Sequence, residues 1–328
     1  MSVPRITVVG SYATGLTMRV DRLPSPGETL LGTGYRVDYG GKGSNQAVGC
    51  ARLGAHASFV ARIGQDSFGA MAQQLYREEG IDLAFVKQVP DAPTGVGFII
   101  VDGAGHNCIT IDPGANERLT AAEVAASEAA FASTAVVLTQ LEIPVEAASA
   151  ALQQGRVQGA ATILNPAPVR PLPDSVLETV DILTPNETEA KVLVGTAVPA
   201  SAGPELIARE LLRRGVKQVV MTLGEKGALI VTETSSTHVP AHSMPCVDST
   251  GAGDAFNAGL ATAIASGASL EAAVQFAVVT GGLAVTRHGV IPSLPTRDQV
   301  TRFYYEREIQ PPGWFSAIAK QSREGGRP

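Results

Sequence analysis

Residues 135–165 read AVVLTQLEIPVEAASAALQQGRVQGAATILN and contain the pattern of a strand, a helix and a second strand. The outer segments, 135–141 and 162–165, are continuous apolar runs, which is typical of strands buried on both faces. The segment between them, 145–153, predicts a helix. A helix between two such strands predicts a βαβ unit with parallel strands.

The same alternation recurs along the chain. Further strand-like runs occupy 6–10, 57–64, 96–101, 181–185, 218–224 and 228–232, and further helix-like segments occupy 44–53, 67–79, 121–131 and 204–214. We therefore expect an α/β fold, a doubly wound and mostly parallel sheet with helices on both faces. In such a sheet, ligands bind at the carboxyl ends of the strands.

Two segments break this alternation. Residues 20–43 are rich in glycine and proline, and residues 95–111 are two apolar runs joined by a DGAGHN turn. We expect a small antiparallel sheet from lid segments at about 16–40 and 95–111, projecting from a single domain of residues 1–310. The tail, 311–328, ends in polar and glycine-rich residues and is expected to be frayed.

Composition excludes several classes of protein. The chain has 328 residues, of which 45% are hydrophobic and 17% charged, with a net charge of -6. This is globular composition, and its acidic balance argues against a nucleic-acid partner or an anionic membrane surface. The segment 255–285 is too interrupted for a membrane span and predicts a buried helix pair. Three cysteines without a C-x-x-C pair, and no secretory signal pattern, predict a cytoplasmic protein.

The strongest motif is VDSTGAGDAFN, residues 247–257, where small residues precede an apolar helix pattern. Free N–H groups at such a helix start favour a bound anion. Asp254 lies at the same helix entrance, where it would be an N-cap in a purely structural interpretation. A carboxylate beside an anion site is better explained as a general base that takes a proton from an attacking hydroxyl. With Asp248 in the same motif, we favour the functional interpretation.

A second motif is YGGKGSNQA, residues 39–47. It lacks the frame of a Walker A loop, and no G-x-G-x-x-G follows the first strand, which argues against dinucleotide binding. The structural alternative is a glycine-rich turn with Ser44 or Asn45 capping a helix. Lys42 and Asn45 instead place donors and an acceptor at one spot, which suits a polyhydroxylated ligand.

A third motif, TPNETE at residues 184–189, follows an apolar strand. Asn186 and Glu189 are three residues apart and share a helix face. The spacing favours a capping box at the start of a helix. The functional alternative is a pair that orders a divalent metal and phosphate through water.

Together, these three motifs resemble the PfkB carbohydrate kinase family, and within it the ribokinases. The resemblance extends from about residue 5 to about 305 and includes PSPGET at 24–29, LNPAP at 164–168, TLGEKG at 222–227 and AVTRHGVIPS at 284–293. It implies a ribokinase-like sheet with a small β-sheet lid that often forms a dimer clasp. It also implies transfer of a phosphoryl group from ATP to a sugar hydroxyl.

The resemblance assigns roles to residues of all three motifs. Asp254 corresponds to the catalytic base, with Gly251, Ala252 and Gly253 as the anion hole. The sugar contacts implied are Gly41, Lys42, Asn45 and Glu142. The implied ATP site consists of Asn186, Thr222, Gly224, Gly227, Gly253 and Val278, with Glu189 helping to order Mg²⁺. The positions that match an activating monovalent cation site, for K⁺, are Asp248, Thr250, Ala284, Arg287, Gly289 and Ser293.

One position departs from the family pattern. Ribokinases carry Asn-x-Asp after the first strand, where the Asp binds sugar hydroxyls, and here Ala13 and Gly15 occupy those places. Thr14, Thr17 or Asp21 are candidates to compensate. Otherwise the pocket accepts a deoxysugar, a ketose or a nucleoside.

We therefore expect an ATP-dependent kinase that phosphorylates a hydroxyl of a pentose such as ribose. The first alternative is a kinase for another sugar, a deoxysugar or a nucleoside. The second is a non-catalytic sugar-binding protein of the same fold. The expected partners are the sugar, ATP and a second copy of the chain, paired through the lid.

Overall fold

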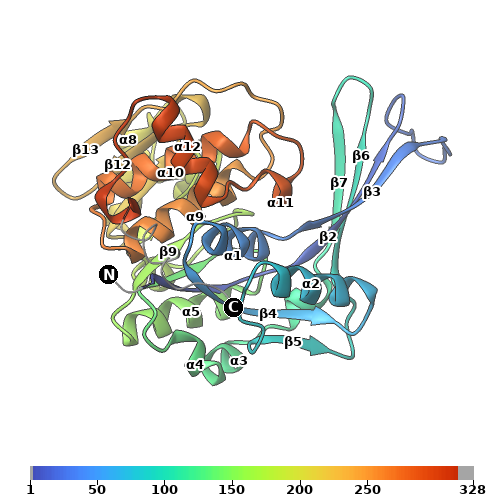
Figure 1. The fold of residues 1–328 in the computed structure, drawn as a ribbon, viewed down its shortest axis with the longest axis horizontal. Coiled ribbons are helices and arrows are strands. Elements are labelled where there is room, and N and C mark those ends of the chain that lie inside the picture. Colours follow the sequence, from blue (N-terminus) through green and yellow to red (C-terminus); the bar gives the residue numbers. More distant parts are fainter. Residues whose placement is uncertain (1–2, 317–328) are drawn as a thin grey trace.

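The computed structural model describes residues 3–316, whose arrangement is shown in Figure 1. The body contains a nine-stranded sheet in the order β13-β12-β11-β10-β9-β8-β1-β4-β5. Its strands are β1 (Arg5–Val9), β4 (His56–Gly64), β5 (Val86–Val89), β8 (Val136–Thr139), β9 (Ala161–Leu164), β10 (Ile182–Leu183), β11 (Gln218–Thr222), β12 (Ala228–Val231) and β13 (Ser236–Val239). Pairings from β5 to β11 are parallel, and only those of β12 are antiparallel. The prediction of a mostly parallel sheet is confirmed.

Helices cover both faces of this sheet, as the alternating sequence predicts. They are α1 (Lys42–Arg52), α2 (Ser67–Glu78), α3 (Ala121–Ala126), α4 (Glu128–Phe131), α5 (Val145–Val157), α6 (Asp174–Leu177), α7 (Glu187–Val194), α8 (Pro204–Arg213), α9 (Ala252–Ala265), α10 (Leu270–Ala284), α11 (Val290–Ser293) and α12 (Arg297–Glu306). Successive strand residues enter different cores, because side chains alternate across a strand. Val8 of β1 packs in the core under α1, α9 and α10, and Val9 packs in the core under α5 and α8.

Helix boundaries differ from expectation in one place. The helix expected over 121–131 is divided at Ser127, whose backbone leaves helical geometry and whose hydroxyl donates to the Glu123 carbonyl. Serine competes for backbone groups in this way and favours helix ends. The pair expected over 255–285 is confirmed as α9 and α10, which pack on each other. Within residues 3–316, none of the helices is both long and apolar enough to span a membrane.

A second sheet, called the lid below, projects from the body (Figure 1). Its order is β3-β2-β6-β7, with β2 (Ala13–Arg19), β3 (Thr33–Gly40), β6 (Gly95–Val101) and β7 (Asn107–Asp112). The expectation of a fully antiparallel sheet is wrong at its centre, because β2 and β6 pair in parallel. Both strands leave the body after a body strand, β1 or β5, and so run outward in the same direction.

The first lid segment also begins earlier than expected, at Ala13, and residues 20–32 form a loop in place of strands. At the other end of the chain, the expected fraying of the tail is wrong for its first residues. Trp314 and Phe315 pack against Phe276 of α10. Residues 317–328 lie outside the described part of the chain.

Candidate active site

The site is built around the first turn of α9. Gly251 is its N-cap, with a φ of 84°, and a Cβ there would stand 2.7 Å from Val290 Cγ1. Glycine is therefore required both by backbone conformation and by space. The Ala252 N–H donates to the Ser249 carbonyl at 3.3 Å. The N–H groups that follow it in the first helical turn have no intrahelical acceptor, so they are available to an anion.

Asp254 is the third residue of this helix, not its N-cap, so the capping interpretation is wrong. Its side chain is 6% exposed and turns toward α1. Asn45 Nδ2 donates to Asp254 Oδ2 at 2.8 Å, and Gln46 Nε2 donates to Oδ1 at 2.9 Å. Two neighbouring residues of the second motif thus bind the carboxylate of the first.

A cavity of about 150 Å³ opens beside this carboxylate. Its lining residues are Lys42, Asn165, Ala167, Thr184, Asn186, Glu189, Thr222, Gly251, Gly253, Asp254 and Asn257. The fold therefore brings together one or more residues from each of the three motifs. Gly224, Gly227 and Val278 do not line this cavity.

The charges in the cavity influence one another. Burial would lower the pKa of Lys42, but the nearby carboxylates of Asp254, Glu142 and Glu189 raise it above its ordinary value. Lys42 is therefore a firmly charged ammonium in this site. Burial raises the pKa of Glu189, and the hydrogen bond from the Asn186 N–H only partly opposes this effect.

The start of α1 depends on close backbone contacts. Its N-cap is Gly41, with a φ of 87°, so neither Ser44 nor Asn45 is the cap. A Cβ on Gly43 would stand 2.5 Å from the backbone nitrogen of Ser11. Glu142 Oε2 accepts the Lys42 N–H at 2.8 Å and the Ser11 hydroxyl at 2.6 Å, which fixes this loop to the end of β8.

Asn186 and Glu189 form the capping box of α7 and also line the cavity. Asn186 Oδ1 accepts the Glu189 N–H at 2.8 Å, and Glu189 Oε2 accepts the Asn186 N–H at 2.9 Å. Asn186 also forms a backbone bridge with Thr222. The structural interpretation of this motif is confirmed, and its position at the cavity leaves the second role open to it as well.

The segments expected to hold a monovalent cation lie side by side. Asp248 Oδ1 accepts the Thr250 N–H at 3.0 Å, and Oδ2 accepts the Gly289 N–H at 3.1 Å. Burial would raise the pKa of Asp248, but these hydrogen bonds lower it overall. Across residues 3–316, three or more His, Cys, Asp or Glu side chains do not gather in a metal-binding group. A cation here would depend mainly on backbone carbonyls.

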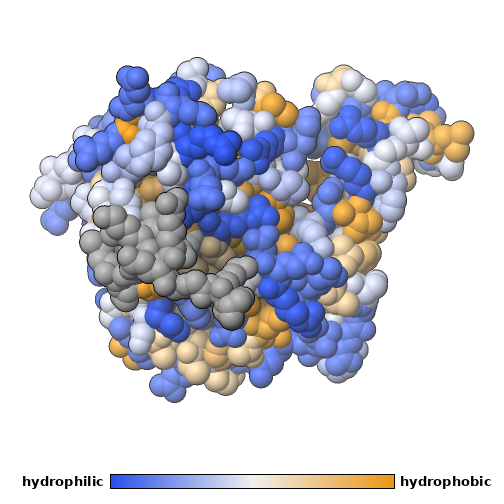
Figure 2. Space-filling view, in the orientation of Figure 1, coloured by the Kyte–Doolittle hydropathy of each residue, from blue (hydrophilic) through white to orange (hydrophobic). Residues whose placement is uncertain are grey.

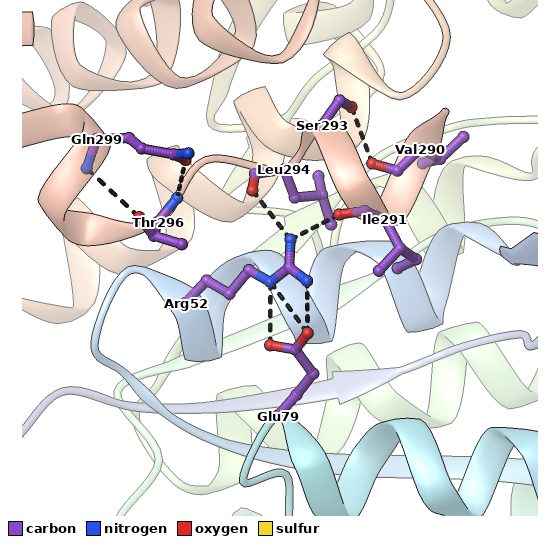
Figure 3. A network of polar contacts seen from close by, with 8 residues as sticks. All are labelled: Arg52, Glu79, Val290, Ile291, Ser293, Leu294, Thr296 and Gln299. Atoms are coloured by element: carbon purple, nitrogen blue, oxygen red, sulfur yellow. Dashed lines mark hydrogen bonds and ion pairs between the residues drawn. The ribbon is translucent and has the colours of Figure 1, made fainter. Parts of the chain in front are cut away.

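Arg52, the last residue of α1, binds the segment that follows Gly289 (Figure 3). Its Nη1 donates to the carbonyls of Ile291 at 2.6 Å and Leu294 at 3.1 Å, and its Nε pairs with Glu79. Because Val290 of the same segment packs beside Gly251, this arginine links α1 to the entrance of α9.

Several polar residues of the site were not singled out from the sequence. They are Gln46, Gln140, Asn165, Thr184 and Asn257, all buried. Asn165 and Thr184 directly follow β9 and β10, so the rule that ligands bind at the carboxyl ends of parallel strands would have indicated them. The sequence carries no comparable signal for Gln140, whose partner is known only from the fold.

Gly15 occupies the position where the family pattern has an aspartate, and Asp38 lies opposite it on the neighbouring lid strand. Gly15 has space for a side chain, since a Cβ there would stand 3.5 Å from Ile99 Cδ1 and 3.8 Å from Asp38 Cβ. Gly15 and Asp38 are cross-strand partners, and such partners share a face of the sheet. Thr14 is fully buried and its hydroxyl bonds to Tyr12, so it faces elsewhere. Asp21 is exposed beyond the end of β2.

Comparisons with known proteins agree with this architecture. The model of the pfkB family of carbohydrate kinases matches residues 3–297. A ribokinase of Haemophilus influenzae is 37% identical over 91% of this chain and 97% of its own. A deoxyribokinase of Salmonella typhi is 33% identical over 91% of this chain and 98% of its own. The structure of Arabidopsis thaliana ribokinase complexed with ribose and ATP matches with a TM-score of 0.84 at 32% identity, covering 92% of this chain and 98% of that one. The chain belongs to the pfkB family of carbohydrate kinases.

Proposed function

We propose that this enzyme is an ATP-dependent pentose kinase, which transfers the γ-phosphoryl group of ATP to a hydroxyl of ribose or a close relative. The observation that carries the proposal is the placement of a buried carboxylate, Asp254, beside the open N-terminus of α9. A base and an anion site at one point are the two elements that transfer to a hydroxyl requires.

In this proposal, Asp254 receives the proton of the acceptor hydroxyl as its oxygen attacks the γ-phosphorus. The bond from the γ-phosphorus to the bridging oxygen breaks, and ADP leaves with its negative charge. The helix start at Gly251, Ala252 and Gly253 serves as the anion hole, whose free backbone N–H groups stabilise charge on the oxygens of the transferred group. Lys42 contributes a positive charge in the same cavity.

The ATP side of the cavity carries Asn186, Glu189 and Thr222. A half-buried carboxylate with only one oxygen engaged by its own helix suits a hydrated Mg²⁺, which prefers oxygen ligands and keeps water. Mg²⁺ would supply charge neutralisation on the phosphates. Gly224, Gly227 and Val278 remain assigned to the more distant parts of the nucleotide, beyond the cavity.

We assign an activating K⁺ to the paired segments around Asp248 and Gly289. Asp248 would provide the one carboxylate of this site, and Thr250, Ala284, Arg287 and Ser293 would supply backbone or hydroxyl oxygens. These segments adjoin Gly251, so a bound cation would order the entrance of α9.

For the acceptor, we propose that Asp38 replaces the family carboxylate that is absent at residue 15. Its Cβ lies 3.8 Å from the Cβ position of Gly15 and on the same face of the lid. The carboxylate is therefore close to the place where the family pattern puts one. This favours ribose or deoxyribose over an acceptor that needs no carboxylate in the lid.

The lid also carries exposed apolar side chains, which Figure 2 shows among hydrophilic ones. They are Leu31, Tyr35, Val37, Phe98, Ile109 and Ile111. Apolar surface of this kind marks a contact with another molecule, and covering it also protects strand edges. We propose a homodimer through the lid, which sedimentation at micromolar concentration tests. The exposed free thiols of Cys108 and Cys246 fit a cytoplasmic enzyme.

The test is an ATP-consumption assay over pentoses, deoxysugars, ketoses and nucleosides, with and without K⁺. Asp254→Asn should reduce turnover by about 10²–10⁴-fold, the contribution of general acid–base catalysis, while retaining ATP binding. Near-normal turnover of this variant would contradict the assignment of Asp254 as the general base. Sugar binding without ATP consumption by the wild type would favour a non-catalytic binding protein.

A further inference from the structure

A chain of buried amide side chains lies directly behind the Asp254 carboxylate. Gln46 Nε2 donates to Asp254 Oδ1 at 2.9 Å and to Asn165 Oδ1 at 3.1 Å. Gln140 Nε2 donates to Gln46 Oε1 at 2.5 Å. Gln46 and Gln140 are both 0% exposed, and neither lines the cavity. Gln46 therefore touches the proposed base from the side away from substrate.

The orientation of these amides follows from the charge at the end of the chain. A carboxylate only accepts hydrogen bonds, so Gln46 must turn its NH₂ group toward Asp254. Its Oε1 then faces Gln140, which must donate in turn. Gln140 Oε1 is left buried without a hydrogen-bond partner in the described part of the chain, beside Gly10. The unsatisfied atom thus lies at the far end, and the carboxylate keeps its donor.

The two oxygens of Asp254 are held differently. Oδ1 is bound by Gln46, whose own position is fixed by Asn165 and Gln140. Oδ2 is bound by Asn45, which the family resemblance assigns to the sugar. The Oδ1 of Asn45 is itself buried without a partner within residues 3–316, so this amide has an acceptor that its protein neighbours leave unused. Oδ2 is consequently the oxygen on the sugar side.

We infer that Gln46 is a positioning residue, which holds Oδ1 of Asp254 so that Oδ2 is directed at the acceptor hydroxyl. This inference rests on the proposed function. The charged groups that face Asp254 across the cavity are Lys42 and Glu189, whose charges interact with it. Gln46 supplies an uncharged donor on the opposite side, which stabilises the ionised carboxylate without competing with the phosphate.

The test compares Gln46→Met with Gln140→Met and Asp254→Asn in the full chain. Methionine keeps the length of the side chain and removes the amide. In Gln46→Met, we expect kcat to fall about ten- to a hundredfold, the effect of losing one hydrogen bond to a charged group. The KM for sugar and for ATP should change little, because Gln46 contacts neither. The acid limb of the kcat profile should move to higher pH, because a donor to the ionised base has been lost. Gln140→Met should show both changes in the same direction and to a smaller extent.

If Gln46 had a purely structural role, Gln46→Met would have a lower melting temperature and an unchanged pH profile of kcat. That result would overturn the inference. A kcat close to that of the wild type in Gln46→Met also overturns it. If Gln46→Met is unaffected while Asp254→Asn is inactive, only the positioning role fails. If Asp254→Asn retains its turnover, the proposed function fails with it.

Discussion

Asp38→Ala tests whether the lid supplies the carboxylate that the family pattern lacks at residue 15. A charged hydrogen bond to a sugar hydroxyl contributes about 1.5–3 kcal/mol, so kcat/KM for ribose should fall about 10- to 150-fold. The loss of the ion pair to Arg36 is a minor effect. Its atoms are 3.6 Å apart with both side chains well exposed, and such a pair contributes about 1 kcal/mol or less.

The matched variant moves the carboxylate to the opposite strand. Gly15→Asp should fit, because Gly15 has no positive φ and a Cβ there meets nothing closer than 3.5 Å. Alone, it places two carboxylates opposite each other, which should destabilise the lid by about 0.2–1 kcal/mol. Combined with Asp38→Ala, it should restore most of the lost kcat/KM for ribose.

The assay is steady-state ATP consumption with ribose and with 2-deoxyribose, together with a melting curve for each variant. Equal kcat/KM for ribose in the wild type and in Asp38→Ala would refute the reasoning. The reasoning would also fail if Gly15→Asp alone had a higher kcat/KM for ribose than the wild type, while the double variant had a kcat/KM no higher than that of Asp38→Ala.

Two further predictions concern the frame around the site. Arg52→Met removes the bonds to the Ile291 and Leu294 carbonyls, so we expect the K⁺ concentration for half-maximal activity to rise several-fold. Glu79→Gln, which keeps those carbonyl bonds, should change it much less, and equal K⁺ titrations for both variants would contradict the link from α1 to α11. Asp66 caps α2 through Gly69 and also accepts from Thr94, so Asp66→Ala should lower the free energy of unfolding by about 1–2 kcal/mol. Burial would raise the pKa of Asp66, but these hydrogen bonds lower it overall. Its contribution is therefore complete above the ordinary value of 3.8 and is lost as pH falls through the lowered pKa. Urea unfolding at decreasing pH should show wild type and variant converging below that value, and a constant difference would count against the assignment.

The fold class and much of the candidate site were accessible from the sequence alone. Continuous apolar runs such as 135–141 require cover on both faces, and only helices on both sides of a parallel sheet provide it. The glycines at 41, 43 and 251 marked close backbone approaches, because a side chain at each would collide with a neighbouring segment. Asp254 was identifiable because a carboxylate beside an anion site has few structural explanations.

Tertiary structure alone decided which polar groups meet. Gln46 and Gln140 are far apart in the chain and no sequence pattern pairs them. Their contact exists because the start of α1 lies beside the end of β8. The sequence also did not predict that Asp38 lies opposite Gly15, because this pairing depends on the register of the two strands. The parallel pairing of β2 with β6 depended on both strands leaving the body in one direction. Local patterns fix where a chain turns and what it buries, whereas contacts between distant polar side chains depend on how the finished elements pack.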